Sequence, residues 1–287
     1  MTDDPFVTYR SLLFTVAYEM LGSAQDAEDV VQETWLRWSR IELDEVRDPR
    51  AYLVRIVTRQ ALNRLRTLSR RREEYVGEWL PEPLLVDSDV AQDAELAENV
   101  SIAMLTILET LRPVERAVFV LHEVFDVPYE EIAEVVGKTQ SAVRQIAHRA
   151  RAHVAARRPR MQIGRALQKE VVENLLAAFT SGNVEELLKV LAPDVVLVAD
   201  GGGQVPAARK PIIGAARVAA FLARAAALPD LVTSVASFNG MPGLRVEVAG
   251  TPIVVSVSVE DGRITRIYAI ANPLKLVWLN KSAKLRR

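Results

Sequence analysis

The stretch PYEEIAEVVGKTQSAVRQIAHRAR, residues 128–151, predicts two short helices joined by a glycine turn. In the first helix the apolar residues recur at i, i+3, i+4 and i+7, so they share one face. Gly137 ends this helix, and Thr139 is a suitable N-cap for the next because its hydroxyl accepts a free backbone N–H. The second helix is apolar on one face and polar and basic on the other. This arrangement is typical of a helix-turn-helix.

The outward face of the second helix carries side chains that can hydrogen-bond to base edges and phosphates in a major groove. These are Ser141, Arg144, Gln145 and His148. An ordinary helical hairpin with a solvated basic face has the same short pattern. However, residues 138–165 carry eight Lys and Arg and no Asp or Glu, and such a run attracts a polyanion. We therefore favour DNA binding.

Composition sets further limits on this chain of 287 residues, which is long enough for two or three domains. It contains no Cys, which excludes disulfides and thiolate metal sites and fits a reducing cytoplasm. Its three His residues are not spaced like metal ligands. No run approaches the ~18 apolar residues of a membrane helix, and the N-terminus does not resemble a signal peptide. We expect a cytoplasmic protein with no metal, no cofactor and no membrane segment.

Charge alternates along the chain, although the net charge is only −1. Residues 47–72 carry nine Arg and one Asp, whereas residues 73–98 carry nine acids and no Lys or Arg. Residues 138–165 form a second basic block. The pattern predicts two DNA-contacting segments that are separated by an acidic tether.

Apolar periodicity predicts helices at 5–21, 24–39 and 51–68, followed by a compact four-helix unit at 99–158. In the second of these helices, Trp35 is expected to face inward.

The segment between these helical parts, residues 76–98, contains two prolines and many acids and is interpreted as a linker. It also carries Trp79 and Leu80, which a purely flexible spacer does not need. We therefore expect the linker to dock on another surface.

From about residue 166 the pattern changes to helices followed by strands, which predicts an α+β domain with a mostly antiparallel, curved sheet over helices. The expected helices lie at 167–180, 184–191 and 214–227. The expected strands lie near 195–198, 232–238, 244–249, 252–259 and 263–270. A turn of Asp followed by three Gly, residues 200–203, can let the backbone approach another surface closely.

Residues 1–160 resemble an extracytoplasmic-function sigma factor of bacterial RNA polymerase. The matching stretches are DAEDVVQETWLRW (26–38), DPRAYLVRIVTRQALNRLR (48–66) and the segment 111–151 that ends in the helix-turn-helix. Residues 166–287 resemble the SnoaL-like, cystatin-type α+β cone domain. The resemblance therefore covers essentially the whole chain.

The subfamily that fuses these two parts has three further motifs. Its linker resembles YVGEWLPEP (75–83), its cone domain has a DGGG turn (200–203), and its last motif is close to Asn-Pro-Asp-Lys-Leu. Here the last motif reads Asn272-Pro273-Leu274-Lys275-Leu276. Because Leu274 replaces the acid, no role that needs a carboxylate at this position is expected.

The resemblance implies a multidomain fold with two all-α sigma modules and a C-terminal α+β cone domain. It divides the chain into sigma region 2 (1–75), an acidic linker (76–98), sigma region 4 with the helix-turn-helix (99–160) and a SnoaL-like regulatory domain (166–287).

The resemblance also implies partners, namely core RNA polymerase, through its clamp coiled coil and flap, and promoter DNA. The residues expected to face the clamp coiled coil are Asp29, Gln32 and Glu33. Those expected to recognise the −10 element are Arg55, Arg59, Asn63, Arg64 and Arg66. Those expected to read the −35 element are Ser141, Arg144, Gln145, His148 and Arg149. The candidates for regulatory contacts between domains are Trp79, Asp200, Gly201, Gly202, Gly203, Asn272, Pro273, Lys275 and Leu276.

Two functions remain to be separated. One is a sigma factor controlled in cis by its C-terminal domain, and the other is a DNA-binding repressor fused to a SnoaL-like enzyme or ligand-binding protein. Residues 154–287 contain no His and no Cys, and no base with a partner can be named, so regulation is favoured over catalysis. The pocket of the cone domain is a candidate site for a small apolar ligand.

Overall fold

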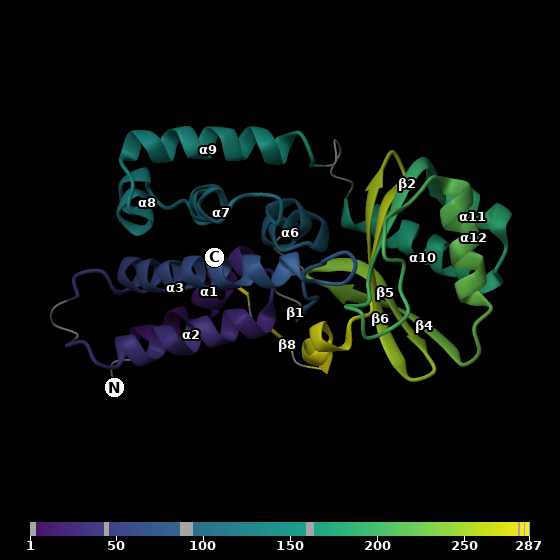
Figure 1. Cartoon of the computed structure of the whole chain (residues 1–287), viewed down its shortest axis with the longest axis horizontal. Helices are drawn as coiled ribbons and strands as arrows, with labels where there is room; N and C mark the ends of the chain where they lie inside the picture. Colours follow the sequence, from purple (N-terminus) through teal and green to yellow (C-terminus); the bar gives the residue numbers. More distant parts are fainter. Residues whose placement is uncertain are drawn as a thin grey trace.

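The computed structural model places two layers of helices beside a sheet domain (Figure 1). It describes residues 4–42, 46–86, 94–158, 164–280, 282–283 and 285–286. We refer to residues 4–73 as the first helical module, 74–86 as the linker segment, 94–158 as the second helical module, and 164–286 as the C-terminal domain.

The first helical module contains three helices, α1 (Pro5–Leu21), α2 (Ala24–Trp38) and α3 (Pro49–Glu73). The Ser23 side chain accepts a hydrogen bond from the backbone N–H of Asp26 and caps α2. The helix expected at 51–68 is longer at both ends. Its earlier start follows from Asp48, which caps it by accepting from Ala51 N at 3.0 Å.

The second helical module contains the predicted helix-turn-helix. Its elements are α5 (Ala94–Asn99), α6 (Ile102–Leu108), α7 (Pro113–Phe119), a π-helical turn η2 (Val120–Val124), α8 (Tyr129–Val136) and α9 (Gln140–Ala155). Gly137 ends α8 with φ 67°, a left-handed conformation that glycine adopts without strain. Thr139 Oγ1 accepts from Ala142 N at 3.2 Å and caps α9, as the sequence predicts. Helix α5 begins inside the expected linker, and residues 87–93 of that linker lie outside the described residues.

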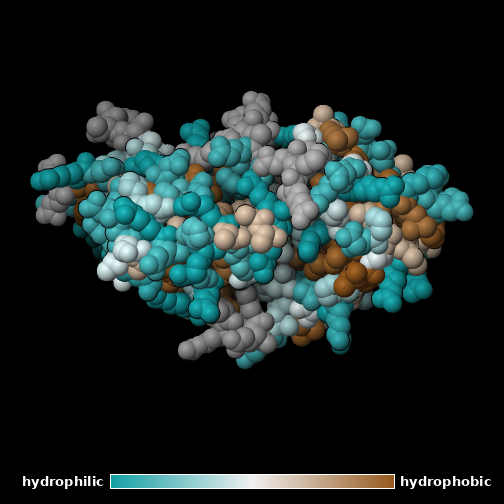
Figure 2. Space-filling view, turned by 90° about the horizontal axis from the view of Figure 1, so that it is seen from above, coloured by the Kyte–Doolittle hydropathy of each residue, from teal (hydrophilic) through white to brown (hydrophobic). Residues whose placement is uncertain are grey.

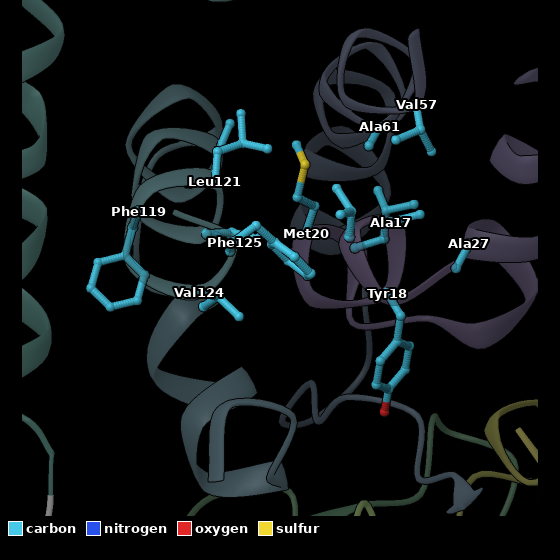
Figure 3. Close-up of a cluster of buried hydrophobic side chains, with 14 of the residues drawn as sticks. Ala17, Tyr18, Met20, Ala27, Val57, Ala61, Phe119, Leu121, Val124 and Phe125 are labelled. Carbon is cyan, nitrogen blue, oxygen red and sulfur yellow. The ribbon is translucent and has the colours of Figure 1, made fainter. Parts of the chain in front are cut away.

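The two helical modules share one hydrophobic core. Figure 3 shows the Met20 side chain of α1 between Leu121 of the second module and Ala61 of α3, with Phe125 close to the base of Met20. These residues belong to one continuous cluster of buried side chains. The modules are therefore packed against each other in this arrangement, and their separation would expose apolar surface to water.

The C-terminal domain has a six-stranded sheet in the order β3-β2-β7-β6-β5-β4. Its helices are α10 (Arg165–Ser181), α11 (Val184–Val190) and α12 (Ala215–Ala226). Its strands are β2 (Leu191–Asp200), β3 (Ile212–Ile213), β4 (Leu231–Phe238), β5 (Met241–Val248), β6 (Thr251–Glu260) and β7 (Arg263–Ile270). Strands β4 to β7 form the expected antiparallel meander. Strand β2 is longer than expected and pairs with β7 in parallel.

The two faces of this sheet pack against different parts of the molecule. Leu197 and Ala199 of β2 belong to the core beneath α10 and α12. Val198, between them, faces the other way and packs with Leu80 of the linker segment and Ile102 of α6. This alternation follows from the two-residue period of a strand. The sheet is thus a single layer between the domain's own core and the rest of the chain.

The C-terminal tail returns to the first helical module (Figure 1). After the 3₁₀ turns η3 (Pro273–Lys275) and η4 (Val277–Asn280), strand β8 (Ser282–Ala283) pairs in parallel with β1 (Leu85–Val86) of the linker segment. The backbone N–H of Arg286 then donates to Thr15 Oγ1 at 2.9 Å. Nothing in the sequence pattern predicted this return.

Candidate nucleic-acid interface and interdomain junction

The outward face of α9 has the geometry of a groove-reading helix. All five residues expected to read the −35 element are exposed: Ser141, Arg144, Gln145, His148 and Arg149. The opposite face is buried in the module core through Val143, Ile146, Ala147 and Ala150. Seen from the side of α9, the helical half of the molecule is mostly hydrophilic (Figure 2). The helix can therefore approach a duplex without losing its packing.

Helix α3 carries the residues expected at the −10 element, and they differ in their surroundings. Arg59, Asn63 and Arg66 are exposed, and Arg66 Nη1 donates to Asn63 Oδ1 at 3.2 Å. Arg64 is half-buried and pairs with the carboxylates of Asp26 and Asp29 on α2, at 2.5 and 3.3 Å. Arg64 thus joins α3 to α2, and its role in DNA recognition stays a prediction.

The helix-turn-helix touches part of the expected −10 surface. Arg59 Nη2 donates to the backbone carbonyl of Glu134 on α8 at 3.0 Å. Arg55 Nη1 lies 3.7 Å from the Glu134 carboxylate, and its guanidinium is 5.1 Å from the ring centroid of Tyr52. Two of the five −10 candidates are therefore in contact with the second helical module.

The residues expected to face polymerase lie along α2. Gln32 and Glu33 are exposed, whereas Asp29 is half-buried beside Arg64. The expectation that Trp35 faces inward is wrong, because its side chain is 39% exposed. The buried tryptophan of this helix is Trp38, which is 3% exposed.

Asp200, the acid of the DGGG turn, is fully buried and binds the linker segment. Its Oδ1 accepts from the hydroxyl of Tyr75 at 2.5 Å, and its Oδ2 accepts from the backbone N–H of Leu80 at 2.9 Å. Burial, and then the neighbouring Asp200 carboxylate, raise the pKa of Tyr75, so the phenol stays protonated and donates. Asn272 Nδ2 donates to the same phenol oxygen at 2.7 Å.

Lys275 completes this contact. Its Nζ lies 2.7 Å from Asp200 Oδ2 and donates to the carbonyl of Leu80 at 2.5 Å. The same ammonium lies 3.3 Å from the ring centroid of Trp79, a favourable cation–π distance. We call the set Tyr75, Trp79, Leu80, Asp200, Asn272 and Lys275 the linker latch.

The glycines of the DGGG turn are closely surrounded. A Cβ on Gly201 would lie 2.8 Å from the Cβ of Ala207, and one on Gly202 would collide with the amide of Asn272. A Cβ on Gly203 would lie 3.2 Å from that of Val76 in the linker segment. The turn therefore approaches its neighbours as closely as the sequence suggested.

A second polar junction, which the sequence did not indicate, centres on Asn239. This residue is fully buried, and its Oδ1 accepts from Leu84 N at 2.9 Å. Its Nδ2 donates at 2.7 Å both to the Tyr18 hydroxyl and to the carbonyl of Val100. One side chain thus bonds the linker segment, the first helical module and the second helical module.

Glu82 and Arg116 add two further contacts between segments. The Glu82 carboxylate accepts from the backbone N–H of Ala24 at 2.8 Å, at the start of α2. Arg116 of α7 is 2% exposed and donates to the carbonyl of Met20 at 2.6 Å, while Glu109 lies 2.8 Å away as its counter-ion. Burial lowers the pKa of Arg116, and the adjacent carboxylate favours the charged form.

The described residues hold no group of three or more His, Asp or Glu side chains that could bind a metal ion. Within the same part of the chain, no helix is both long and apolar enough to cross a membrane.

Residues 6–71 match the family model for Sigma-70 region 2, and residues 101–154 match the one for Sigma-70, region 4. ECF RNA polymerase sigma factor SigJ of Mycobacterium tuberculosis (strain H37Rv) is 37% identical, covering 94% of this chain and 91% of the relative. The chain belongs to the ECF family of RNA polymerase sigma factors.

Two further comparisons agree with this membership. The probable ECF sigma factor SigI of the same strain is 33% identical, covering 93% of this chain and 92% of the relative. The crystal structure of M. tuberculosis SigJ matches with a TM-score of 0.74 at 34% identity, covering 95% of this chain and 97% of that chain. Residues 6–71 of the first helical module thus match sigma region 2, and residues 101–154 of the second match sigma region 4. The resemblance drawn from the sequence motifs is confirmed, and the repressor interpretation is not needed.

In this ECF sigma factor, sequence reasoning brought together most of the linker latch but missed Tyr18, Glu82, Arg116 and Asn239. The available signal for Asn239 was the Asn-Gly turn between two expected strands, which predicts a hairpin but not a buried amide. Pro273 is exposed at the edge of the latch, and Leu276 packs with Leu80 in the core behind the sheet.

Proposed function

We propose that this sigma factor directs RNA polymerase to promoters and that its C-terminal domain holds regions 2 and 4 in a closed arrangement. The observation that carries the proposal is the contact of Arg59 with Glu134, which sets region 4 against the helix expected to open the −10 element. In this arrangement Arg55 and Arg59 of α3 contact Glu134 of α8, so α3 does not present all of its expected DNA residues while region 4 stays in place.

Promoter recognition requires the two regions to separate. Each region alone would bind DNA weakly, and a tether makes the second contact effectively intramolecular. The tether works only if its length allows both sites to be reached. Here the linker segment is fixed at Leu80 by the latch and at Leu84 by Asn239. We infer that binding to polymerase releases the linker and exposes α3.

The C-terminal domain acts in this proposal as a brace and not as an enzyme. Its buried ionic pair, Asp200 and Lys275, is occupied by the linker segment and is not open to a substrate. An apolar cavity between its sheet and helices α10 and α12 supports the proposal that the domain binds a small apolar ligand. We further propose that the protein acts in the cytoplasm with core polymerase and promoter DNA.

The test is transcription by purified core polymerase on a library of genomic fragments from the source organism, with and without the full chain. Sequencing of RNA 5′ ends should reveal start sites that share −10 and −35 elements only when the chain is present. Transcripts identical to those of core polymerase alone would contradict the sigma-factor proposal.

The cis-control part needs a separate comparison. Asp200→Asn in the full chain should increase transcription from those start sites at limiting core polymerase, because it weakens the latch. Asp194→Asn, an exposed change on the same strand, is the matched control. Equal transcription by both variants and the wild type would contradict cis control.

A further inference from the structure

The C-terminal domain contains a partly enclosed apolar cavity between its sheet and helices α10 and α12. Its volume is about 180 Å³, and every lining residue is apolar. Leu175 and Phe179 of α10, and Phe221 of α12, form one side, while the inner face of the sheet forms the other. No charged or hydrogen-bonding side chain is among the described residues that line it.

The lining restricts what can bind there. A buried water needs two to four polar partners, and the side chains of these walls offer none. A charged or strongly polar ligand would lose its hydration without compensation. An engineered apolar cavity of about 150 Å³ in another protein stays dry and binds benzene, so the size here suits a single ring or a short alkyl chain.

The cavity and the linker latch share the ends of the same two strands. Ala199 lines the cavity, and the next residue, Asp200, faces the linker segment. Ala271 lines it as well, and the next residue, Asn272, faces Tyr75. The carbonyl of Asp200 accepts from both Ala271 N and Asn272 N, at 2.8 and 2.9 Å, so the two strand ends move together.

The glycine turn extends this connection. Gly201 lies against Ala207, which lines the cavity, whereas Gly202 lies against Asn272 of the latch. Gly203 lies against Val76 of the linker segment. Three consecutive residues thus run from the cavity wall to the linker.

We propose that the cavity binds a small, uncharged, hydrocarbon-like ligand, and that this ligand strengthens the linker latch. The ligand binds the closed arrangement, in which the cavity walls are formed. The latch residues Asp200 and Asn272 directly follow Ala199 and Ala271, which line the cavity. Release of the linker frees the glycine turn and weakens the site. Because coupling is reciprocal, the ligand must then favour the closed arrangement. The inference rests on the closed state of the proposed function, although ligand binding itself can be measured without transcription.

In the experiment, toluene is added to the full chain. Benzoate, a charged molecule of similar size, is added to a separate sample as the control. Methyl NMR of Ala, Leu and Val residues reports binding, and hydrogen exchange of the Leu80 amide reports the latch. Toluene is expected to shift the methyl signals of cavity residues, and benzoate at the same concentration is not. Saturating toluene should slow Leu80 exchange about fivefold or more, the range of ordinary allosteric coupling.

Two alanines of α12 provide matched variants. Ala225 lines the cavity, so Ala225→Leu should fill it and abolish the toluene shifts. Ala220 is exposed on the same helix, so Ala220→Leu should leave them unchanged. Asp200→Asn should weaken toluene binding, by no more than the factor by which toluene slows Leu80 exchange.

Toluene binding no stronger than that of benzoate, or unaffected by Ala225→Leu, would overturn the site. Binding that leaves Leu80 exchange unchanged would overturn the coupling. If the chain directs promoter-specific transcription but fails these tests, only this inference is overturned. If the chain passes these tests but directs no promoter-specific transcription, only the proposed function is overturned.

Discussion

The Nζ atom of Lys275 lies 2.7 Å from Oδ2 of Asp200, and the two side chains are 4% and 0% exposed. The pair binds the backbone of one linker residue on both sides, because Asp200 accepts from Leu80 N and Lys275 donates to Leu80 O. A buried ion pair contributes little net stability by itself, since desolvation offsets the attraction. We infer that its effect here is specificity, because Asp200 and Lys275 each bond Leu80 of the linker segment as well as each other.

Asp200→Asn is expected to reduce the free energy of unfolding by about 3–5 kcal/mol, because it leaves the Lys275 ammonium buried without its counter-ion. Urea unfolding of the full chain measures this change. Adding Lys275→Met to the same chain should recover part of the loss, since no charge is then left buried. An Asp200→Asn chain as stable as the exposed control Asp194→Asn would contradict this account of the latch.

Asn239 combines three interdomain hydrogen bonds with a backbone φ of 54°. Loss of its amide should cost about 2–4 kcal/mol in total, at about 1 kcal/mol or more for each buried bond. Asn239→Ala adds a left-handed Cβ penalty of about 1 kcal/mol, which Asn239→Gly avoids. Urea unfolding should therefore rank the wild type above Asn239→Gly and Asn239→Gly above Asn239→Ala. A glycine variant as stable as the wild type would show that the bonds contribute nothing.

Glu82 should make stability depend on pH in a defined direction. Burial raises the pKa of its carboxyl above the ordinary 4.5, so the folded chain binds this proton more tightly than the unfolded chain. The contribution of Glu82 to the free energy of unfolding is therefore full below pH 4.5 and is lost as the pH rises through the raised pKa. Glu82→Gln removes this titration and keeps an oxygen that can accept from Ala24 N.

The measurement is urea unfolding of the wild type and Glu82→Gln between about pH 7 and about pH 5. The wild type should gain stability relative to the variant as the pH falls. A difference that stays constant, or that changes in the opposite direction, would contradict the raised pKa.

Arg66 and Arg64 both belong to the expected −10 surface, but Arg66 is exposed and Arg64 is half-buried against α2. Arg66→Ala should weaken promoter opening while the free energy of unfolding changes by less than about 0.5 kcal/mol, as for an exposed side chain. Arg64→Ala should lower stability as well, because it leaves Asp26 and Asp29 without the cation that joins α2 to α3. Permanganate footprinting measures the opening. Unchanged opening by Arg66→Ala would remove this residue from the DNA surface.

Local sequence signals predicted the elements well where side chains of a few neighbouring residues determine the structure. Gly137 and Thr139 mark the turn and the cap of the helix-turn-helix, and both have that role in the structure. The face of α9 follows from helical periodicity alone. Trp35 shows the limit of this reasoning, because an apolar residue at the edge of the buried stripe can remain exposed.

Contacts between distant segments could not be predicted in the same way. Asn239 and Tyr18 are separated by 221 residues, and neither belongs to a pattern that points to the other. The return of the tail to Thr15 depends on how the sheet domain sits against the helices, which no local period encodes. The DGGG turn was recognised as a site of close approach, but its contact surfaces required the structure.

We propose that the linker latch holds sigma regions 2 and 4 closed until polymerase binds. The chain has no Cys, so Arg37→Cys on α2 and Ala152→Cys on α9, both exposed positions, allow two spin labels to be attached specifically. Double electron–electron resonance then measures the distance between the regions in the full chain. The free chain should give one narrow distribution, Asp200→Asn should broaden it, and core polymerase should move it to a longer distance. A distribution that core polymerase leaves unchanged would contradict the claim.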